Sequence, residues 1–96
     1  MRIISQDGTI DIPYGLTSIQ LVSKTTIVAQ GSYFGSGNDN FATIAEYSTE
    51  AKAQKAMEML REKYKDYAKA TNKSNFFTMF DYPKVFQFPK DEDVEV

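Results

Sequence analysis

The longest regular pattern of hydrophobic and polar positions in this chain runs from Ser48 to Ala70. Apolar side chains recur there every three or four residues, and at about 100° per residue they fall within one arc about 100° wide. This spacing predicts one long amphipathic helix whose apolar stripe faces a core, with Ser48 as its N-cap and Asn72 as its stop signal. The stripe consists of Ala53, Ala56, Met57, Leu60, Tyr64 and Tyr67.

Shorter segments on both sides of this helix have the β-branched or alternating composition of strands. Asp7-Gly8 favours a tight turn, and Pro13, which lacks an N–H group, ends a strand or lies at a sheet edge. The segment Phe41–Tyr47 is apolar on both of its faces, so we expect it at the centre of a sheet. The predicted strands are Arg2–Ser5, Ile10–Ile12, Thr17–Val22, Thr25–Gln30, Phe41–Tyr47 and Val85–Phe88.

Together these elements predict an α+β fold. We expect a strongly twisted, mainly antiparallel sheet of about five or six short strands, with one long amphipathic helix packed across it. A small curled barrel capped by the helix, as in pleckstrin-like modules, is the alternative. Residues 1–89 are expected to form a single domain and residues 90–96 an acidic C-terminal tail, and the last strand either returns to the sheet or swaps onto a partner.

Composition narrows the class of protein. The 96 residues, 42% hydrophobic and 25% charged, suit one small globular domain. The sequence shows no secretory leader, no apolar run long enough to span a bilayer and no cysteine, so we expect a cytoplasmic protein with no membrane partner. The net charge of −2 is unevenly divided, because Glu50 to Lys73 holds seven basic and four acidic residues whereas the tail from Lys90 is acidic. The tail either docks on the basic helix or stays solvated.

The absence of histidine and cysteine limits the candidate chemistry. Acid–base catalysis near neutral pH most often uses histidine, and thiol nucleophiles and common zinc sites need cysteine or histidine. The acids outside the helix and tail form no recognisable catalytic spacing. The predicted turn accounts for an aspartate at Asp7, and the predicted loop accounts for one at Asp39. We therefore expect no catalytic, metal-binding or cofactor-binding residue. These acids are Asp7, Asp11, Asp39, Glu46 and Asp81.

Nucleotide and nucleic-acid binding are both poorly supported by the sequence. The segment Gly35–Asn40 begins like a dinucleotide-binding glycine motif, but Asn40 replaces the last glycine and a strand, not a helix, follows. An EF-hand loop would need more acids than this segment contains. The net negative charge makes nucleic acid an unlikely partner, yet the helix lysines and nearby aromatic residues leave a weak single-stranded nucleic-acid binder as an alternative.

An aromatic stretch follows the predicted helix. Six of the chain's 13 aromatic residues lie between Phe76 and Phe88, which is many for the core of a small protein to absorb. Core packing or self-association is the simpler explanation, and part of the stretch is a candidate interface. We add Met59, which the helical wheel places among charges and which we expect to be exposed unless something packs on that side of the helix. The candidate partner surface comprises Met59, Phe76, Phe77, Phe80 and Tyr82.

Three segments carry a resemblance to a known group of proteins. Met1-Arg2-Ile3-Ile4-Ser5-Gln6-Asp7-Gly8, Glu46-Tyr47-Ser48-Thr49-Glu50-Ala51-Lys52-Ala53 and the ending Val85–Val96 resemble small phage and prophage proteins of Gram-positive bacteria. Residues 31–40 and 75–82 lie outside this resemblance. The group has no assigned activity and no defined site residues, so the resemblance implies a cytoplasmic, phage-type accessory protein.

The sequence therefore leaves three functional hypotheses. The first is a non-enzymatic accessory protein that binds another protein or a second copy of itself. The second is the weak single-stranded nucleic-acid binder. The third is an enzyme that uses only carboxylates and lysine, which requires such groups to converge in a concave site.

Overall fold

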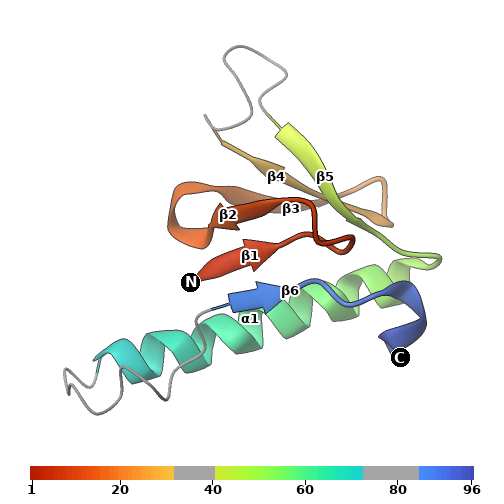
Figure 1. The fold of residues 1–96 in the computed structure, drawn as a ribbon. Coiled ribbons are helices and arrows are strands. Elements are labelled where there is room, and N and C mark those ends of the chain that lie inside the picture. Colours follow the sequence, from red (N-terminus) through yellow and green to blue (C-terminus); the bar gives the residue numbers. More distant parts are fainter. Residues whose placement is uncertain (32–40, 73–84) are drawn as a thin grey trace.

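The computed structural model describes residues 1–31, 41–72 and 85–96 (Figure 1). Six strands, one α-helix and two short 3-10 helices are present in this part of the chain. In chain order they are β1 (Arg2–Ile4), β2 (Asp11–Pro13), η1 (Tyr14–Leu16), β3 (Ser18–Val22), β4 (Thr26–Gln30), β5 (Phe41–Glu46), α1 (Glu50–Asn72), β6 (Val85–Gln87) and η4 (Asp91–Asp93).

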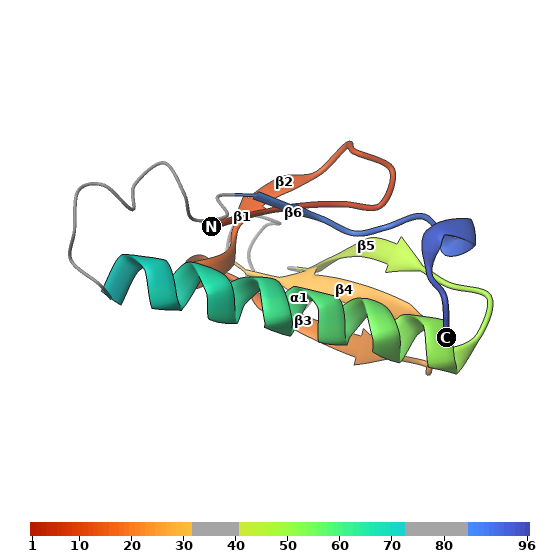
Figure 2. The same ribbon diagram turned by 90° about the horizontal axis from the view of Figure 1, so that it is seen from below.

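The strands form two sheets of three, in the orders β2-β1-β6 and β3-β4-β5. In the first sheet β1 pairs antiparallel with β2 and parallel with β6, so that Ile3 lies between Ile12 and Phe86. The second sheet is antiparallel throughout. Figure 2 shows the two sheets one above the other, with α1 running across their open side. The predicted α+β class, long helix and number of strands are confirmed.

The prediction of a single sheet is wrong, and the segment between β2 and β3 explains why. Pro13 ends β2 without an N–H group to donate, and η1 then turns the chain away before β3 begins. The strand β3 therefore pairs with β4 and not with β2. The barrel alternative is not observed either, because the strand ladders of the two sheets do not close on each other.

The expected central position of Phe41–Tyr47 is also wrong, because β4 is the central strand and β5 lies at the edge. The pairing of β5 with β4 shifts register where Ile27 faces Ala45 and Val28 faces Thr43, which leaves Ile44 as an extra residue. This bulge buries Ile44 and Ala45 together, although they are neighbours in sequence. A bulge, not burial on both sides, therefore explains the apolar character of the strand.

The exposed edge of β5 is covered by one residue of the turn that follows β1. The backbone N–H of Gln6 donates to the Ile44 carbonyl at 2.8 Å. The side-chain amide of Gln6 forms two hydrogen bonds with the backbone of Glu46. It donates to the Glu46 carbonyl at 3.0 Å and accepts from the Glu46 N–H at 3.1 Å. Gln6 thereby forms the hydrogen bonds that a neighbouring strand would form with the end of β5, and it connects the two sheets at that point.

One hydrophobic core lies between the two sheets and the helix. Ile3 and Phe86 from the first sheet and Ile27 from the second meet Ala56 and Leu60 of α1 there. Ala53 and Ala56 are fully buried, because a side chain no larger than methyl lets the helix backbone approach the sheets closely. The predicted core-facing stripe is confirmed over this first half of the helix. No helix in the described ranges is long and apolar enough to cross a membrane.

The start of α1 differs from the prediction by one residue. The helix begins at Glu50, and the Thr49 hydroxyl accepts the Lys52 N–H at 3.2 Å, so Thr49 rather than Ser48 is the N-cap. Ser48 instead bonds the C-terminal segment, through its N–H and its hydroxyl to the Asp91 carboxylate at 2.7 and 3.0 Å. The helix ends at the predicted stop residue, Asn72.

Candidate functional site

The predicted turn residue Asp7 is held by three hydrogen bonds. Its Oδ1 accepts from the Ser5 hydroxyl at 2.7 Å, from the Thr9 N–H at 3.0 Å and from the Thr9 hydroxyl at 2.7 Å. These bonds, with that from Ser5 the strongest, lower the pKa of Asp7 to about 2. Gly8 allows the turn by adopting a φ of 81°. The carboxylate therefore fixes the turn as an acceptor, and its low pKa makes it a poor proton donor.

The other acids outside the helix and tail, where described, do not converge on a reactive centre. Asp11 pairs across the β1–β2 ladder with Arg2, whose hydrogen bond lowers the pKa of the carboxyl group. Asp7 and Glu46 do line the same shallow hollow of about 180 Å³, together with Gln6. Within residues 1–31, 41–72 and 85–96, no three acids gather as metal ligands would. Asp39 and Asp81 lie outside the described residues.

The hollow with the most suitable lining for a partner is a groove between α1 and β6. It encloses about 460 Å³ and opens to the surface. One wall is formed by β6 through Val85, Phe86 and Gln87. The other wall is formed by successive turns of α1, which supply Lys55, Glu58, Met59, Glu62, Lys63 and Asp66. We call this the α1–β6 groove.

Among the described residues, the strand wall of the α1–β6 groove is an unpaired sheet edge. The Phe88 N–H donates to the Ile4 carbonyl at 3.1 Å, so Phe86 and Phe88 direct their backbone groups toward β1. Because the backbone alternates, the N–H and C=O groups of Val85 and Gln87 point the opposite way. The strand β6 is the last in its sheet, and no described strand pairs with this edge. These groups are therefore available to an added strand.

The helix wall carries charges of both signs around an apolar centre. Lys55 lies 3.6 Å from Glu58, and Glu62 lies 3.3 Å from Lys65. Met59 and the buried Phe86 supply the apolar lining between these charges. Such exposed ion pairs have little net energy, about 0–1 kcal/mol each, so they rearrange at small cost when a charged partner approaches.

The C-terminal segment packs against the start of the helix. Lys52 donates to the Asp91 carbonyl at 2.9 Å and lies 3.4 Å from its carboxylate. The pKa of Asp91 is lowered chiefly by the hydrogen bond from the Ser48 N–H. The Ser48 hydroxyl and the Lys52 ammonium group lower it further. Val94 is buried in the core with 3% of its surface exposed. The acidic C-terminal tail therefore docks on the start of the helix and does not stay solvated.

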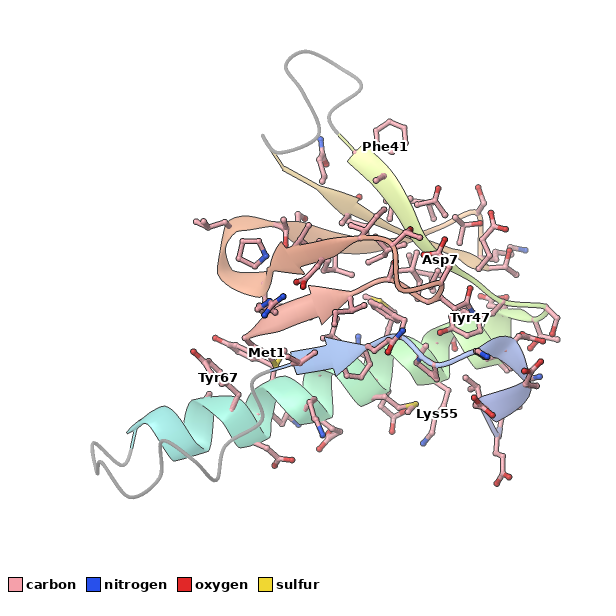
Figure 3. The ribbon with its side chains drawn as sticks, in the orientation of Figure 1. Met1, Asp7, Phe41, Tyr47, Lys55 and Tyr67 are labelled. Atoms are coloured by element: carbon pink, nitrogen blue, oxygen red, sulfur yellow. The ribbon has the colours of Figure 1, made fainter. Side chains whose placement is uncertain are left out.

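A second bond attaches this segment to the end of β5. The Tyr47 hydroxyl donates to the Pro89 carbonyl at 2.7 Å (Figure 3). Burial, and secondarily the negative charge of Asp91, raise the pKa of Tyr47 to about 12. The phenol therefore stays protonated at physiological pH and acts as a structural donor.

The predicted partner surface is placed only in part. Met59 lines the α1–β6 groove and is partly buried against the core, so the exception to its expected exposure applies: another element packs there. The helical wheel missed this because β6 covers a side of the helix that the wheel alone assigns to solvent. Phe76, Phe77, Phe80 and Tyr82 lie outside the described residues. Val85 was not singled out from the sequence, although its position in an alternating strand indicates exposure.

In comparisons with protein-family models, curated proteins and solved structures, nothing matches this chain.

Proposed function

We propose that this chain is a non-enzymatic, cytoplasmic accessory protein of phage type that binds another protein. The partner enters the α1–β6 groove as an extended segment and adds a strand to β6. The observation that carries this proposal is the free edge of β6 beside a groove with an apolar centre. Main-chain hydrogen bonds from a sheet edge supply affinity, and neighbouring side-chain pockets supply specificity.

The dimensions of the groove suit an extended peptide. Its helix wall runs over twelve residues from Lys55 to Asp66, and the eleven steps between them correspond to about 16.5 Å at the rise of an α-helix. An extended strand covers that length with about five residues. A segment of this size contacts both Met59 on the helix and Val85 on the strand.

The side chains of the groove define the chemistry of the partner segment. Alternate residues of an added strand point toward and away from α1. A partner with an apolar residue facing Met59 and Phe86 buries it in the centre of the groove. Acidic and basic residues on either side of it then meet Lys63 and Asp66. We therefore expect short alternating segments with one central apolar residue and flanking charges of both signs.

A selection from a random-peptide display library tests this proposal. We expect enriched peptides of alternating pattern that shift the amide resonances of Val85 and Gln87. The change Lys63→Glu, within the groove, should weaken their binding about tenfold or more, because it reverses a charge beside the peptide. The matched change Arg61→Glu reverses an exposed charge on the same helix outside the groove lining, and should leave the affinity nearly unchanged.

Two results would contradict the proposal. One is a library that yields no binder to the folded protein. The other is a set of binders whose affinity falls equally with Lys63→Glu and with Arg61→Glu, since charge on the helix in general would then explain the binding. Circular dichroism of both variants serves as the control for folding.

The nucleic-acid alternative is less well supported by the charges of the helix. Lys52, Lys55 and Lys65 each lie within 4 Å of an acid, so their charge is partly neutralised. Titration of a labelled single-stranded oligonucleotide at about 50 and about 200 mM salt distinguishes the two hypotheses. We expect no binding at the lower salt. Binding there that vanishes at the higher salt would favour the nucleic-acid hypothesis.

A further inference from the structure

The sheet β3-β4-β5 has one face in the core and one face that no described element covers (Figure 2). Ile19, Leu21, Ile27 and Ala29 point toward the core. Because side chains alternate along a strand, their neighbours point the other way. We call this surface the outer sheet face, and it is formed mainly by Gln20, Val22, Val28, Gln30, Phe41 and Thr43.

The outer sheet face has an apolar centre. A hollow of about 260 Å³ lies on it, bordered by Val22 and Val28 on one side and by Phe41 on the other. Phe41 leaves 50% of its surface exposed, and Figure 3 shows its ring at the end of the sheet far from α1. A large exposed aromatic side chain beside buried valine favours contact with another protein surface.

We propose that a second copy of this chain packs on the outer sheet face to form a twofold homodimer. In a twofold interface the same patch meets itself, so any net charge on the patch would repel its own copy. Except for Glu46 at one end, the described residues of this face are uncharged, whereas α1 and the C-terminal segment are densely charged. The outer sheet face is therefore suited to self-association.

Two of the charges at the rim of the face, Lys24 and Glu46, specify the orientation of the copies. Lys24 lies in the turn between β3 and β4, and Glu46 ends β5 opposite Thr26, at the same end of the sheet. A twofold axis parallel to β4 exchanges the β3 side with the β5 side. This arrangement brings Lys24 of each copy toward Glu46 of the other, which gives two equivalent contacts. It also stacks the two Val28 residues near the axis. Sheets packed in this aligned way lie about 10 Å apart.

The size of the face indicates a weak dimer. Three strands of five residues cover about 14 by 17 Å, which is well below the area of about 800 Å² that each partner contributes to a standard interface. We therefore expect monomer and dimer to exchange, with dimer dominating only at high protein concentration.

Analytical ultracentrifugation from about 10 µM to about 1 mM protein tests the dimer, across the range of weak affinities. We expect the weight-average mass to rise toward that of two chains. Phe41→Lys should abolish the rise, because it places two like charges in the interface. The matched change Leu16→Lys, at a residue exposed to 67% outside this sheet, should leave the rise intact.

A charge exchange tests the orientation. Lys24→Glu or Glu46→Lys alone should weaken dimerisation about threefold or more, and the two changes together should restore it. A protein that stays monomeric at about 1 mM would overturn the dimer. A dimer that survives Phe41→Lys, or a double variant that is weaker than either single variant, would overturn the assigned face. Peptide binding in the α1–β6 groove is measured on the same variants, so failure of one proposal is distinguished from failure of the other.

Discussion

The two halves of helix α1 have opposite environments. In the first half, Ala53, Ala56 and Leu60 are buried in the core, and the C-terminal segment packs against the start of the helix. In the second half, the residues from Arg61 to Asp66 are all exposed. Tyr64, a predicted member of the buried stripe, keeps 40% of its surface exposed and stacks on Tyr14 at 4.7 Å between ring centroids.

This difference shows how one helix both stabilises the fold and presents a surface. The first half contributes the burial that holds the two sheets together. The α1–β6 groove begins at Lys55 in the first half and continues to Asp66, and the second half contributes its exposed Glu62, Lys63 and Asp66. Substitutions of the exposed groove residues in the second half should therefore alter partner binding at small cost to the stability of the fold. The predictions below test this division, from the largest expected effect to the smallest.

Leu60→Ala should destabilise the protein most. Truncation of a buried leucine removes its transfer energy and leaves a cavity, which together cost about 2–5 kcal/mol. Urea denaturation followed by circular dichroism measures the free energy of unfolding. Tyr64→Ala in the second half is the matched comparison and should cost less than about 1.5 kcal/mol, the upper value of an aromatic pair. An equal loss for both variants would contradict the division of the helix.

Val94→Ala tests whether the C-terminal segment belongs to the core. Val94 is 3% exposed, and removal of its two methyl groups should cost about 2 kcal/mol in the free energy of unfolding. Val96 lies two residues further on with 76% of its surface exposed, so Val96→Ala should change stability by less than about 0.5 kcal/mol. Thermal unfolding of the two variants gives the comparison, and similar melting curves would indicate that the segment does not dock in solution.

Thr49→Ala tests the cap that begins the first half. Loss of an N-cap hydroxyl costs about 1 kcal/mol. Ser48→Ala removes only the bond from the Ser48 hydroxyl to Asp91 and leaves the stronger backbone bond in place, so we expect a smaller loss. Chemical denaturation of both variants decides between them. A larger effect at Ser48 would restore it as the cap and shift the helix start by one residue.

Mild acid should loosen the first half through Asp91. Its pKa is lowered in the folded state, chiefly by the Ser48 N–H, so its stabilising contribution is present above the usual value of 3.8 and is lost as the pH falls through the lowered pKa. Hydrogen exchange of the Ser48 amide should therefore accelerate below about pH 4 relative to amides in the core. Asp91→Asn should remove this pH dependence, whereas Asp7→Asn, which removes a carboxylate bonded to Ser5 and Thr9 and not to Ser48, should leave it in place.

The local elements were predictable because their signals lie in neighbouring residues. The period of α1, its stop at Asn72 and the positions of all six strands follow from side-chain spacing and turn residues. The errors arose where one pattern has two causes. Consecutive apolar residues in Phe41–Tyr47 indicated a central strand, whereas the bulge at Ile44 buries both neighbours in an edge strand.

The candidate site was much less predictable than the elements that form it. Met59 was identified, yet for the wrong reason, since it lines a groove only because β6 returns beside α1. That return depends on parallel pairing between residues near opposite ends of the chain, such as Ile3 with Phe86. No local pattern specifies such a partner. The turn role of Asp7 was predicted correctly, because the groups that donate to its carboxylate, on Ser5 and Thr9, lie within two residues.

The sequence by itself determined one helix with a buried stripe, six short strands and a chain without histidine or cysteine, because periodicity and composition act over a few residues. The tertiary structure alone decided the separation into two sheets, the central place of β4, the docking of the tail and the α1–β6 groove. Each of these depends on which distant segments pair, and that choice is made by the burial of apolar surface over the whole chain.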